Sequence, residues 1–357
     1  MPTFGISQLK LLEKLCNVIA VSGDEGEVRK IVLEAVKPYA DEVKVDALGN
    51  VLVTKLGSRP GSNPKGGRKR LRVMLDAHMD EVGLMIVDDE GEGLYRFETI
   101  GGVDARHLVG KQVYVGKDRT PGVIGARPVH LMNADEYTKK VPVEALRIDL
   151  GLGGKAKVGD RGGFATRFRR VGPSVMAKSI DDRIGVATLI ELLKQAPPQI
   201  DLCAAFSVQE EIGLRGAKVA AQYFNPDLAI AIDSTPANDL PVHDGSENMS
   251  YNTKLGRGPA IYVADGSTLH DPRLVRFLRE TAEAEKIPYQ IRQPGGGGTD
   301  SGAIQRALAG IPTVSVSVPH RYTHSPVSIA RLDDWKHTLN LLHAALKRIT
   351  PEWIALR

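Results

Sequence analysis

Hydrophobic residues along this chain follow two different patterns. Before about residue 83 and after about residue 175, they recur every three or four positions, as in amphipathic helices, or gather in short runs typical of buried strands. The pattern predicts helices over 7–19, 26–36, a stretch after Ser179, 217–224, 271–286 and 332–346, and strands over 42–46, 50–55, 71–75, 202–208, 228–232 and 313–318. Alternating strands and helices predict an α/β fold with a mostly parallel sheet flanked by helices.

Between these two parts, the pattern changes. Residues 84–174 are rich in Val, Gly and Arg, and show little helical periodicity. Short alternating runs separated by glycines occur at 108–115, 122–126, 147–150 and 164–168. We therefore expect an inserted small domain, rich in β-structure and barrel-like, over 84–174. The larger domain is then discontinuous and consists of 1–83 plus 175–357.

Composition narrows the class of protein. Hydrophobic residues make up 42% and charged residues 25% of the 357, as in globular proteins, and the net charge of +4 is spread out. No nucleic-acid partner is expected, because the one dense basic stretch, 65–72, lies in a Gly/Pro-rich loop and no aromatic platform accompanies it. The two cysteines, Cys16 and Cys203, lie in apolar runs and form no CxxC motif, which argues against a disulfide framework or a cysteine zinc site.

The sequence also predicts where the protein works. It has no secretory signal pattern and no apolar run of about 18 residues, so we expect no membrane partner and a cytoplasmic location.

Acidic residues and histidines follow the predicted strands where each strand ends. They comprise His78 and Asp80, Glu210 and Glu211, Asp233, and His320 and His324, while the pair Asp181-Asp182 opens a predicted helix. Because open α/β sheets bind ligands beyond the carboxyl ends of their strands, we expect these side chains to form one site. Mixed imidazole and carboxylate groups favour a pair of divalent cations, with zinc first and cobalt or manganese as alternatives.

Each position also has a purely structural interpretation. Asp181 and Asp182 are good helix caps, Glu210 and Glu211 are compatible with a solvated loop, and a single histidine is more often a satisfied polar residue than a ligand. Such residues nevertheless occur at four strand ends and one helix start of the same fold, and this combination favours a metal site. Two neighbouring cations need a shared carboxylate, and one of two adjacent glutamates can serve as a base while the other binds metal. Asp80, two residues beyond His78, can orient its imidazole.

Four ordered motifs resemble those of a known family. The segments AHMDEVG (77–83), IDDRIG (180–185), QEEIGLRGA (209–217) and RYTHSP (321–326) are similar to the motifs of TET-type dinuclear metalloaminopeptidases, family forty-two of the metallopeptidases. That group includes glutamyl, leucyl and lysyl aminopeptidases. The resemblance extends over nearly the whole chain, including GVIG (122–125), VP (141–142) and IDLG (148–151) in the insert.

The resemblance implies a role for each residue. Asp181 would bridge the metals, His78 and Asp233 would complete one metal site, and Glu211 and His324 the other. Glu210 would be the general base and Asp80 would orient His78, while His320 competes with His324. The segment GGGGTDS (295–301) would lie near the substrate. The fold would be of the phosphorylase/hydrolase-like, zinc-peptidase type, and the insert would drive dimers that assemble into a dodecamer.

These roles imply the removal of N-terminal residues from peptide substrates. Water between the metals would lose a proton to Glu210, which would pass it to the leaving amine. A related amidohydrolase, either a carboxypeptidase or an N-deacylase, is the main alternative, with Arg183 or Arg321 as the cation a carboxypeptidase needs. A non-catalytic scaffold would lack a ligand or the base, and none is missing. Some relatives bear the label endoglucanase or cellulase, but these residues do not support glycoside hydrolysis, which needs two carboxylates and no metal.

Overall fold

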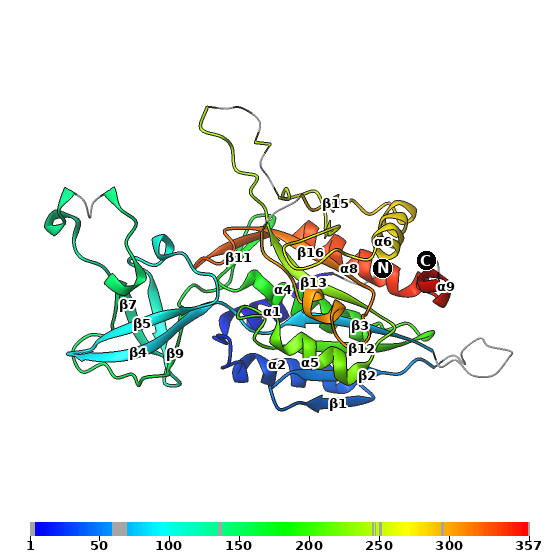
Figure 1. Ribbon diagram of the computed structural model, residues 1–357, viewed down its shortest axis with the longest axis horizontal. Coiled ribbons are helices and arrows are strands. Elements are labelled where there is room, and N and C mark those ends of the chain that lie inside the picture. The colour runs from blue at the N-terminus through cyan, green and yellow to red at the C-terminus, as the bar shows by residue number, and fades with distance from the viewer. Residues whose placement is uncertain are drawn as a thin grey trace.

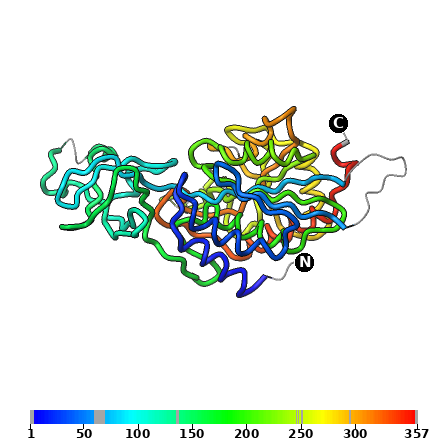
Figure 2. The backbone as a smooth tube through the Cα atoms, turned by 90° about the horizontal axis from the view of Figure 1, so that it is seen from below, coloured from blue at the N-terminus to red at the C-terminus, as the bar shows by residue number. Residues whose placement is uncertain are grey.

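The computed structural model describes residues 4–58, 70–134, 138–244, 246, 248–249, 252–293 and 296–355. Residues 65–69 of the basic stretch lie outside these ranges, while Arg70 pairs with Asp201 and Arg72 belongs to a strand. Figure 1 shows two parts, a larger one built on a wide sheet and a smaller one that projects from one of its ends, and Figure 2 shows the same projection from below.

The wide sheet has a parallel centre. Four neighbouring strands run in the same direction, in the order β12 (Ile200–Ser207), β3 (Leu71–His78), β13 (Leu228–Pro236) and β16 (Thr313–Arg321). The margins are antiparallel: β1 (Glu42–Val45) and β2 (Val51–Lys55) lie beside β12, and β17 (Ser328–Arg331), β11 (Ser174–Ala177) and β10 (Arg169–Val171) lie beyond β16. The predicted α/β class is confirmed. Short connections join β1 to β2, β10 to β11 and β16 to β17, and connections of this length can join only antiparallel neighbours.

Helices cover both faces of the sheet. The larger core lies under α1 (Ile6–Asn17), α2 (Gly26–Val36), α4 (Ile180–Lys194), α6 (Pro272–Ala284) and α8 (Leu332–Arg348), and the smaller core lies under α5 (Arg215–Phe224) and α7 (Ser301–Gln305). Strand β3 shows how the sequence sorts the faces. Val73 and Leu75 enter the larger core and Met74 the smaller one, so the two-residue period places His78 on the face of α5 and α7.

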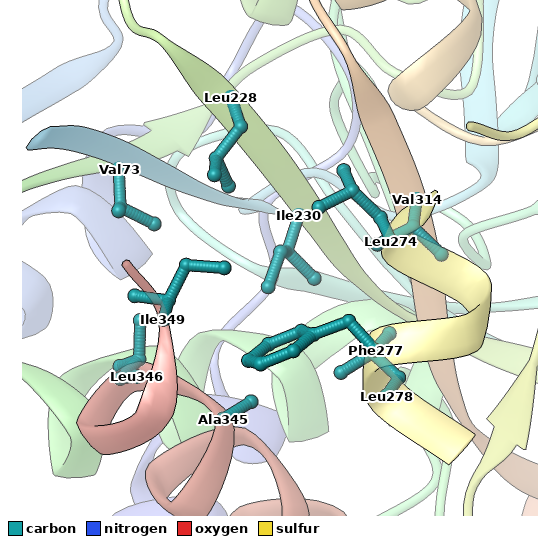
Figure 3. Close-up of a pocket in the computed structure, with 10 residues that line it drawn as sticks. All are labelled: Val73, Leu228, Ile230, Leu274, Phe277, Leu278, Val314, Ala345, Leu346 and Ile349. Carbon is teal, nitrogen blue, oxygen red and sulfur yellow. The ribbon is translucent and has the colours of Figure 1, made fainter. Parts of the chain in front are cut away.

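Short elements complete this part. Strand β14 (Ala260–Ile261) pairs with β16 and with β15 (Gln290–Ile291), and α9 (Pro351–Ala355) packs near α6. Figure 3 shows a small recess between the sheet, α6 and α8 that is lined only by apolar side chains. Val73, at the start of β3, lines this recess, so it lies toward the opposite end of the strand from His78. None of the helices in the described ranges is long and apolar enough to cross a membrane.

The projecting part is a closed six-stranded barrel. Its strands follow one another around the barrel as β4 (Gly83–Gly91), β5 (Leu94–Ile100), β8 (Arg147–Asp149), β7 (Thr120–Gly125), β6 (Gln112–Val115) and β9 (Arg161–Phe164), around a separate apolar core. The prediction of a barrel-like insert is thus confirmed. The two longest strands, β4 and β5, have no counterpart among the runs identified from the sequence. The reason is that β4 is apolar only in its first half and ends in exposed Asp88, Asp89 and Glu90.

A tight turn joins β4 to β5 and gives a stability prediction. Gly91 and Gly93 both have φ of +85°, a conformation that is unfavourable for side chains. A Cβ on Gly91 would meet open space, whereas a Cβ on Gly93 would lie 2.0 Å from the carbonyl oxygen of Gly151. We expect Gly91→Ala to lower the free energy of unfolding by about 1–2 kcal/mol. Gly93→Ala should cost about 1–3 kcal/mol more, because backbone must move.

Urea unfolding of the two glycine variants beside the unmodified protein measures this difference, with Gly91→Ala as the matched control. Equal losses of stability in the two variants would contradict the prediction, because the contact with Gly151 would then contribute nothing.

Candidate metal centre

The carboxyl ends of the parallel strands converge on a cluster of imidazoles and carboxylates. In the described part of the chain, two groups of three side chains each place one ligand atom within 4.8 Å of one another. One group is His78, Asp181 and Asp233, and the other is Asp181, Glu211 and His324. Asp181 belongs to both groups.

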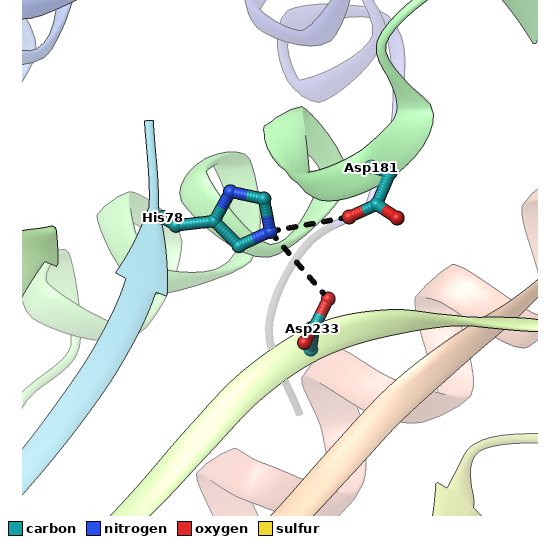
Figure 4. A group of neighbouring side chains, drawn as sticks. All are labelled: His78, Asp181 and Asp233. Carbon is teal, nitrogen blue, oxygen red and sulfur yellow. Dashed lines mark hydrogen bonds and ion pairs between the residues drawn. The ribbon is translucent and has the colours of Figure 1, made fainter. Parts of the chain in front are cut away.

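The first group is held by two strands and the start of a helix. Nε2 of His78, the last residue of β3, lies 3.2 Å from Oδ1 of Asp181 and 3.8 Å from Oδ1 of Asp233. Figure 4 shows the same imidazole nitrogen facing both carboxylates. Asp233 lies inside β13, because that strand continues to Pro236 instead of ending at residue 232. The strand continues through polar residues because its ladder with β16 extends to His320.

The second group joins the middle of the sequence to a segment near its C-terminal part. Nε2 of His324 lies 3.1 Å from Oε2 of Glu211 and 3.7 Å from Oδ2 of Asp181. Asp181 therefore directs one carboxylate oxygen toward each imidazole, Oδ1 toward His78 and Oδ2 toward His324. Glu211 comes from the loop between β12 and α5, and His324 from the connection between β16 and β17.

Asp181 and Asp182 have different environments. The backbone of both residues is non-helical, so regular helix begins only after them. Oδ1 of Asp182 accepts a hydrogen bond from the backbone N–H of Gly185 at 3.0 Å, which is the usual cap geometry. A Cβ on residue 185 would lie 2.2 Å from that carboxylate, so the cap also requires Gly185. The capping interpretation thus applies to Asp182, and Asp181 is left to face the cluster.

Asp80 connects three parts of the site. Its Oδ1 lies 3.5 Å from Nδ1 of His78, the nitrogen that faces away from the cluster. The same carboxylate accepts the backbone N–H groups of Glu210 at 3.0 Å and Glu211 at 3.2 Å, and the hydroxyl of Ser22 at 2.6 Å. Burial favours the neutral acid, but His78 and Ser22 outweigh it and hold the pKa of Asp80 below its ordinary value. Asp80 therefore fixes an imidazole and the backbone of both glutamates together.

Glu210 lies beside the cluster but in neither group of three. Its Oε2 is 4.0 Å from Nε2 of His78. Burial raises the pKa of the Glu210 carboxyl well above its usual range, and the His78 imidazolium opposes that shift while the Asp300 carboxylate adds to it. A buried carboxylate next to the cluster, with its backbone fixed by Asp80, has the environment that a general base requires.

The charges of the cluster test whether cations fit it. Burial raises the pKa of Asp233 and of Glu211, and the Asp181 carboxylate adds to both shifts. Burial works against a charged His324, but Glu211 outweighs it and raises the pKa of His324 to about 9. Oε1 of Glu211 is buried with no hydrogen-bond partner. The carboxylates are thus crowded together, and one of them keeps a proton on the His324 imidazole in the absence of metal. This excess of negative charge, together with the unused Oε1 of Glu211, fits the binding of divalent cations.

His320 has other partners. It is fully buried within β16, and its Nε2 lies 3.0 Å from the hydroxyl of Ser234 and 2.9 Å from that of Thr323. Burial lowers the pKa of His320 to about 4. It belongs to neither group of three, so the geometry favours His324 over His320 as a metal ligand.

Two polar residues near the cluster, Ser207 and Asp76, were not identified from the sequence, and they contact Asp300 of the glycine-rich segment. The hydroxyl of Ser207 lies 2.9 Å from Oδ2 of Asp300 and 3.1 Å from Oδ2 of Asp76. These contacts join β12, β3 and the start of α7 in one buried polar layer. Asp300 lies in the glycine-rich segment and Asp76 in the strand before His78. Their proximity has no signal in the sequence, because 224 positions separate them along the chain.

The two arginines that a carboxypeptidase could use are already paired. Nη2 of Arg183, a fully buried side chain, lies 3.2 Å from Oε1 of Glu81. Nε of Arg321 donates to Oδ1 of Asp239 at 2.6 Å, and the side chain of Asp239 is 9% exposed. Arg183 is thus buried against Glu81, whereas Arg321 uses its Nε on Asp239 and keeps a side chain that is 32% exposed.

An α/β fold that joins imidazoles and carboxylates around one shared aspartate is typical of hydrolases that use two divalent cations. Residues 62–341 match the family model described as M42 glutamyl aminopeptidase. The chain therefore belongs to the M42 aminopeptidase family, and it is a metal-dependent hydrolase of peptide bonds.

Individual relatives agree with this assignment. The chain is 33% identical over 356 residues to the lysyl aminopeptidase of Pyrococcus furiosus, which covers 96% of this chain and 97% of the relative. It is 31% identical over 363 residues to the glutamyl aminopeptidase of Lactococcus lactis, with 96% and 97% covered.

Solved structures show the same fold. An aminopeptidase from the archaeon Desulfurococcus kamchatkensis superposes with a TM-score of 0.89 at 35% identity, covering 98% of this chain and 96% of that one. A TET1 peptidase from Pyrococcus horikoshii, described as assembling into a tetrahedron or a large octahedral shell, gives 0.81 at 34%, covering 96% and 100%.

Proposed function

We propose that this chain removes N-terminal residues from peptides with two divalent cations held by five side chains. His78 and Asp233 would hold one cation, Glu211 and His324 the other, and Asp181 both. The observation that carries this proposal is the position of Asp181, whose two carboxylate oxygens lie 3.2 Å from His78 and 3.7 Å from His324. Zinc suits these ligands best, with cobalt or manganese as alternatives.

When bound, the cations would make a water more acidic and polarise the scissile carbonyl. The chain's own residues supply the rest of the mechanism. Glu210, whose Oε2 lies 4.0 Å from His78, would take a proton from the attacking water and return it to the leaving amine. Asp80 keeps that base in position by accepting its backbone N–H. The free α-amino group of the substrate would lie among the carboxylates, which would restrict cleavage to the first residue.

An activity panel tests this proposal. Metal-loaded protein should hydrolyse amino-acid anilides with a free α-amino group, and N-acetylated anilides should be poor substrates. Removal of the metal by a chelator should abolish this activity, and added zinc, cobalt or manganese should restore it. Hydrolysis of the acetylated set alone would favour an N-deacylase or a carboxypeptidase and would contradict the proposal.

We also propose a homo-oligomer, with the barrel of the 84–174 insert forming dimers that build a dodecamer. The projection of the barrel from one end of the larger part supports this proposal, since it leaves much of the barrel's surface open to another copy (Figures 1 and 2). Light scattering on the purified chain would test it, because a species of 38.6 kDa alone would contradict it. A cytoplasmic location and the domain boundaries remain proposals from the sequence.

A further inference from the structure

One buried cation in the described part of the chain lacks a carboxylate partner. Buried lysines and arginines occur at four positions there: Lys178, Arg183, Arg273 and Arg292. The first two pair with Glu81, at 2.5 Å and 3.2 Å, and the third pairs with Asp271 at 2.5 Å. Arg292 is only 5% exposed and forms no ion pair with any described residue. Burial of an unpaired charge is unfavourable, so this position needs an explanation.

The neighbours of Arg292 leave one side of its guanidinium unused. Nε donates to the hydroxyl of Thr235 at 3.3 Å, Nη2 donates to the carbonyl of Gly296 at 3.0 Å, and the guanidinium carbon lies 4.8 Å from the ring centre of Tyr262. Nη1 is buried and has no hydrogen-bond partner. The aromatic ring compensates part of the charge, but it accepts none of the unused N–H bonds.

These contacts place Arg292 next to the proposed metal centre. Thr235 lies two residues beyond Asp233 on the same face of β13, which corresponds to about 7 Å along a strand. Tyr262 follows β14 and donates its backbone N–H to the carbonyl of Ser315 at 3.1 Å, in the strand beside β13. Gly296 belongs to the glycine-rich segment that leads into Asp300. The guanidinium of Arg292 therefore lies beside the residue two positions after the proposed ligand Asp233.

The acidic side chain three residues beyond Tyr262, Asp265, already has partners. Asp265 lies 3.4 Å from Nε2 of His270 and accepts the backbone N–H of Ser267 at 2.7 Å. Asp265 is therefore already engaged, whereas Nη1 of Arg292 is buried without a hydrogen-bond partner and can bind an acidic side chain.

We propose that Arg292 determines specificity by binding the side-chain carboxylate of an N-terminal glutamate or aspartate. This inference rests on the proposed function, since it presumes that the N-terminal residue lies at the cations. An acidic side chain on that residue keeps a fixed distance from the scissile carbonyl. The terminal carboxylate of a peptide does not, because its distance changes with peptide length. The names of the two relatives, lysyl and glutamyl, differ in the residue they recognise, so family membership alone does not decide the preference.

Steady-state kinetics of metal-loaded variants test the inference. The wild-type protein should have a higher kcat/KM for glutamyl and aspartyl anilides than for leucyl or lysyl anilides. Arg292→Gln should lower kcat/KM for the acidic anilides by about 10-fold or more, with the leucyl value changed by less than about 3-fold. Arg292→Lys, which keeps the charge but loses the fork, should lie between them. Arg276→Gln, at a surface position with a 54% exposed side chain, is the matched control and should change neither.

Three outcomes would overturn the inference. Equal losses on acidic and leucyl anilides would show that Arg292 only supports the glycine-rich segment. A wild-type enzyme without acidic preference would refute the specificity directly. A loss that appears with dipeptides and not with anilides would assign the guanidinium to a terminal carboxylate. Failure of the wild type on every anilide would instead refute the proposed function itself.

A second measurement does not depend on the folding of any variant. Free L-glutamate, the expected product, should raise the Tm of metal-loaded wild-type protein more than L-leucine or L-lysine at the same concentration. No difference among the three amino acids would contradict a carboxylate site at Arg292.

Discussion

Replacement of Glu210 by glutamine is expected to lower kcat/KM for anilide hydrolysis by about 10²–10⁴-fold, the usual contribution of a general base. The amide has nearly the same shape, so the loop should keep its backbone hydrogen bond to Asp80 at 3.0 Å. The glutamine amide, however, cannot take a proton from the attacking water. Because Glu210 lies in neither group of three possible ligands, the bound metal per chain should stay close to that of the wild type.

The control for Glu210→Gln is the same change at Glu280 of α6, whose side chain is 47% exposed. Metal content and activity should be measured on the same preparations. An active Glu210→Gln protein with full metal would refute the assignment of the base. A loss of activity that accompanied a loss of metal would instead make Glu210 a ligand.

Glu81→Gln is expected to lower the free energy of unfolding by about 3–5 kcal/mol, the usual effect of breaking a buried ion pair from one side. Glu81 is only 2% exposed, and its two oxygens lie 2.6 Å and 2.5 Å from Nζ of Lys178. Its Oε1 also lies 3.2 Å from Arg183 and accepts the N–H of Ala20 at 2.8 Å. Without this carboxylate, two cations would remain buried with no anion beside them.

A surface pair gives the comparison for Glu81. Lys14 and Glu34 lie 3.4 Å apart with side chains 62% and 71% exposed, so Glu34→Gln should cost less than about 1 kcal/mol. Urea unfolding of both variants, with metal removed by a chelator, measures the contrast. Similar small losses in the two variants would show that the buried network contributes nothing beyond an exposed ion pair.

The pKa values give this prediction a pH dependence. Burial disfavours the charged form of Glu81, but Lys178 and Arg183 outweigh it and hold the pKa of Glu81 below its ordinary value of 4.5. A depressed folded pKa stabilises the protein above the unfolded value, and this stabilisation is lost as pH falls through the folded pKa. The difference between Glu81→Gln and wild type should therefore be complete above about pH 5 and should shrink below it.

The sequence predicts the parallel centre of the sheet because its strands are short apolar runs that need no partner to be recognised. Strand ends are harder to predict. Asp233 and His320 look like loop residues by polarity, yet both lie inside strands because the ladder between β13 and β16 continues through them. Strand β4 is not predicted for a different reason, because its second half is exposed and polar and so lacks an apolar run.

The candidate site shows the same division. Residue type and position after a strand identify His78, Glu211 and Asp233, and the structure brings these side chains together with Asp181 and His324. Contacts between distant segments carry no local signal. The hydrogen bond from Ser22 to Asp80 spans 58 positions, and the residues around neither side chain predict it. The sequence also does not decide whether Asp181 or Asp182 caps the helix. The path of the backbone decides this, because it places Asp182 against Gly185.

The place where the barrel is inserted has a consequence for how the metal centre assembles. His78 and Asp181 are 103 positions apart, and nearly all of the intervening chain forms the barrel. Closing a flexible loop of that length costs about 4 kcal/mol in chain entropy. The first and last strands of the barrel, however, are paired with each other, Leu84 with Gly162. A barrel that folds early would therefore hold the two halves of the centre close together before any cation arrives. The insert would then lower the entropic cost of assembling a site to which it gives no proposed metal ligand, although its Gly102 carbonyl lies 3.2 Å from Nδ1 of His324.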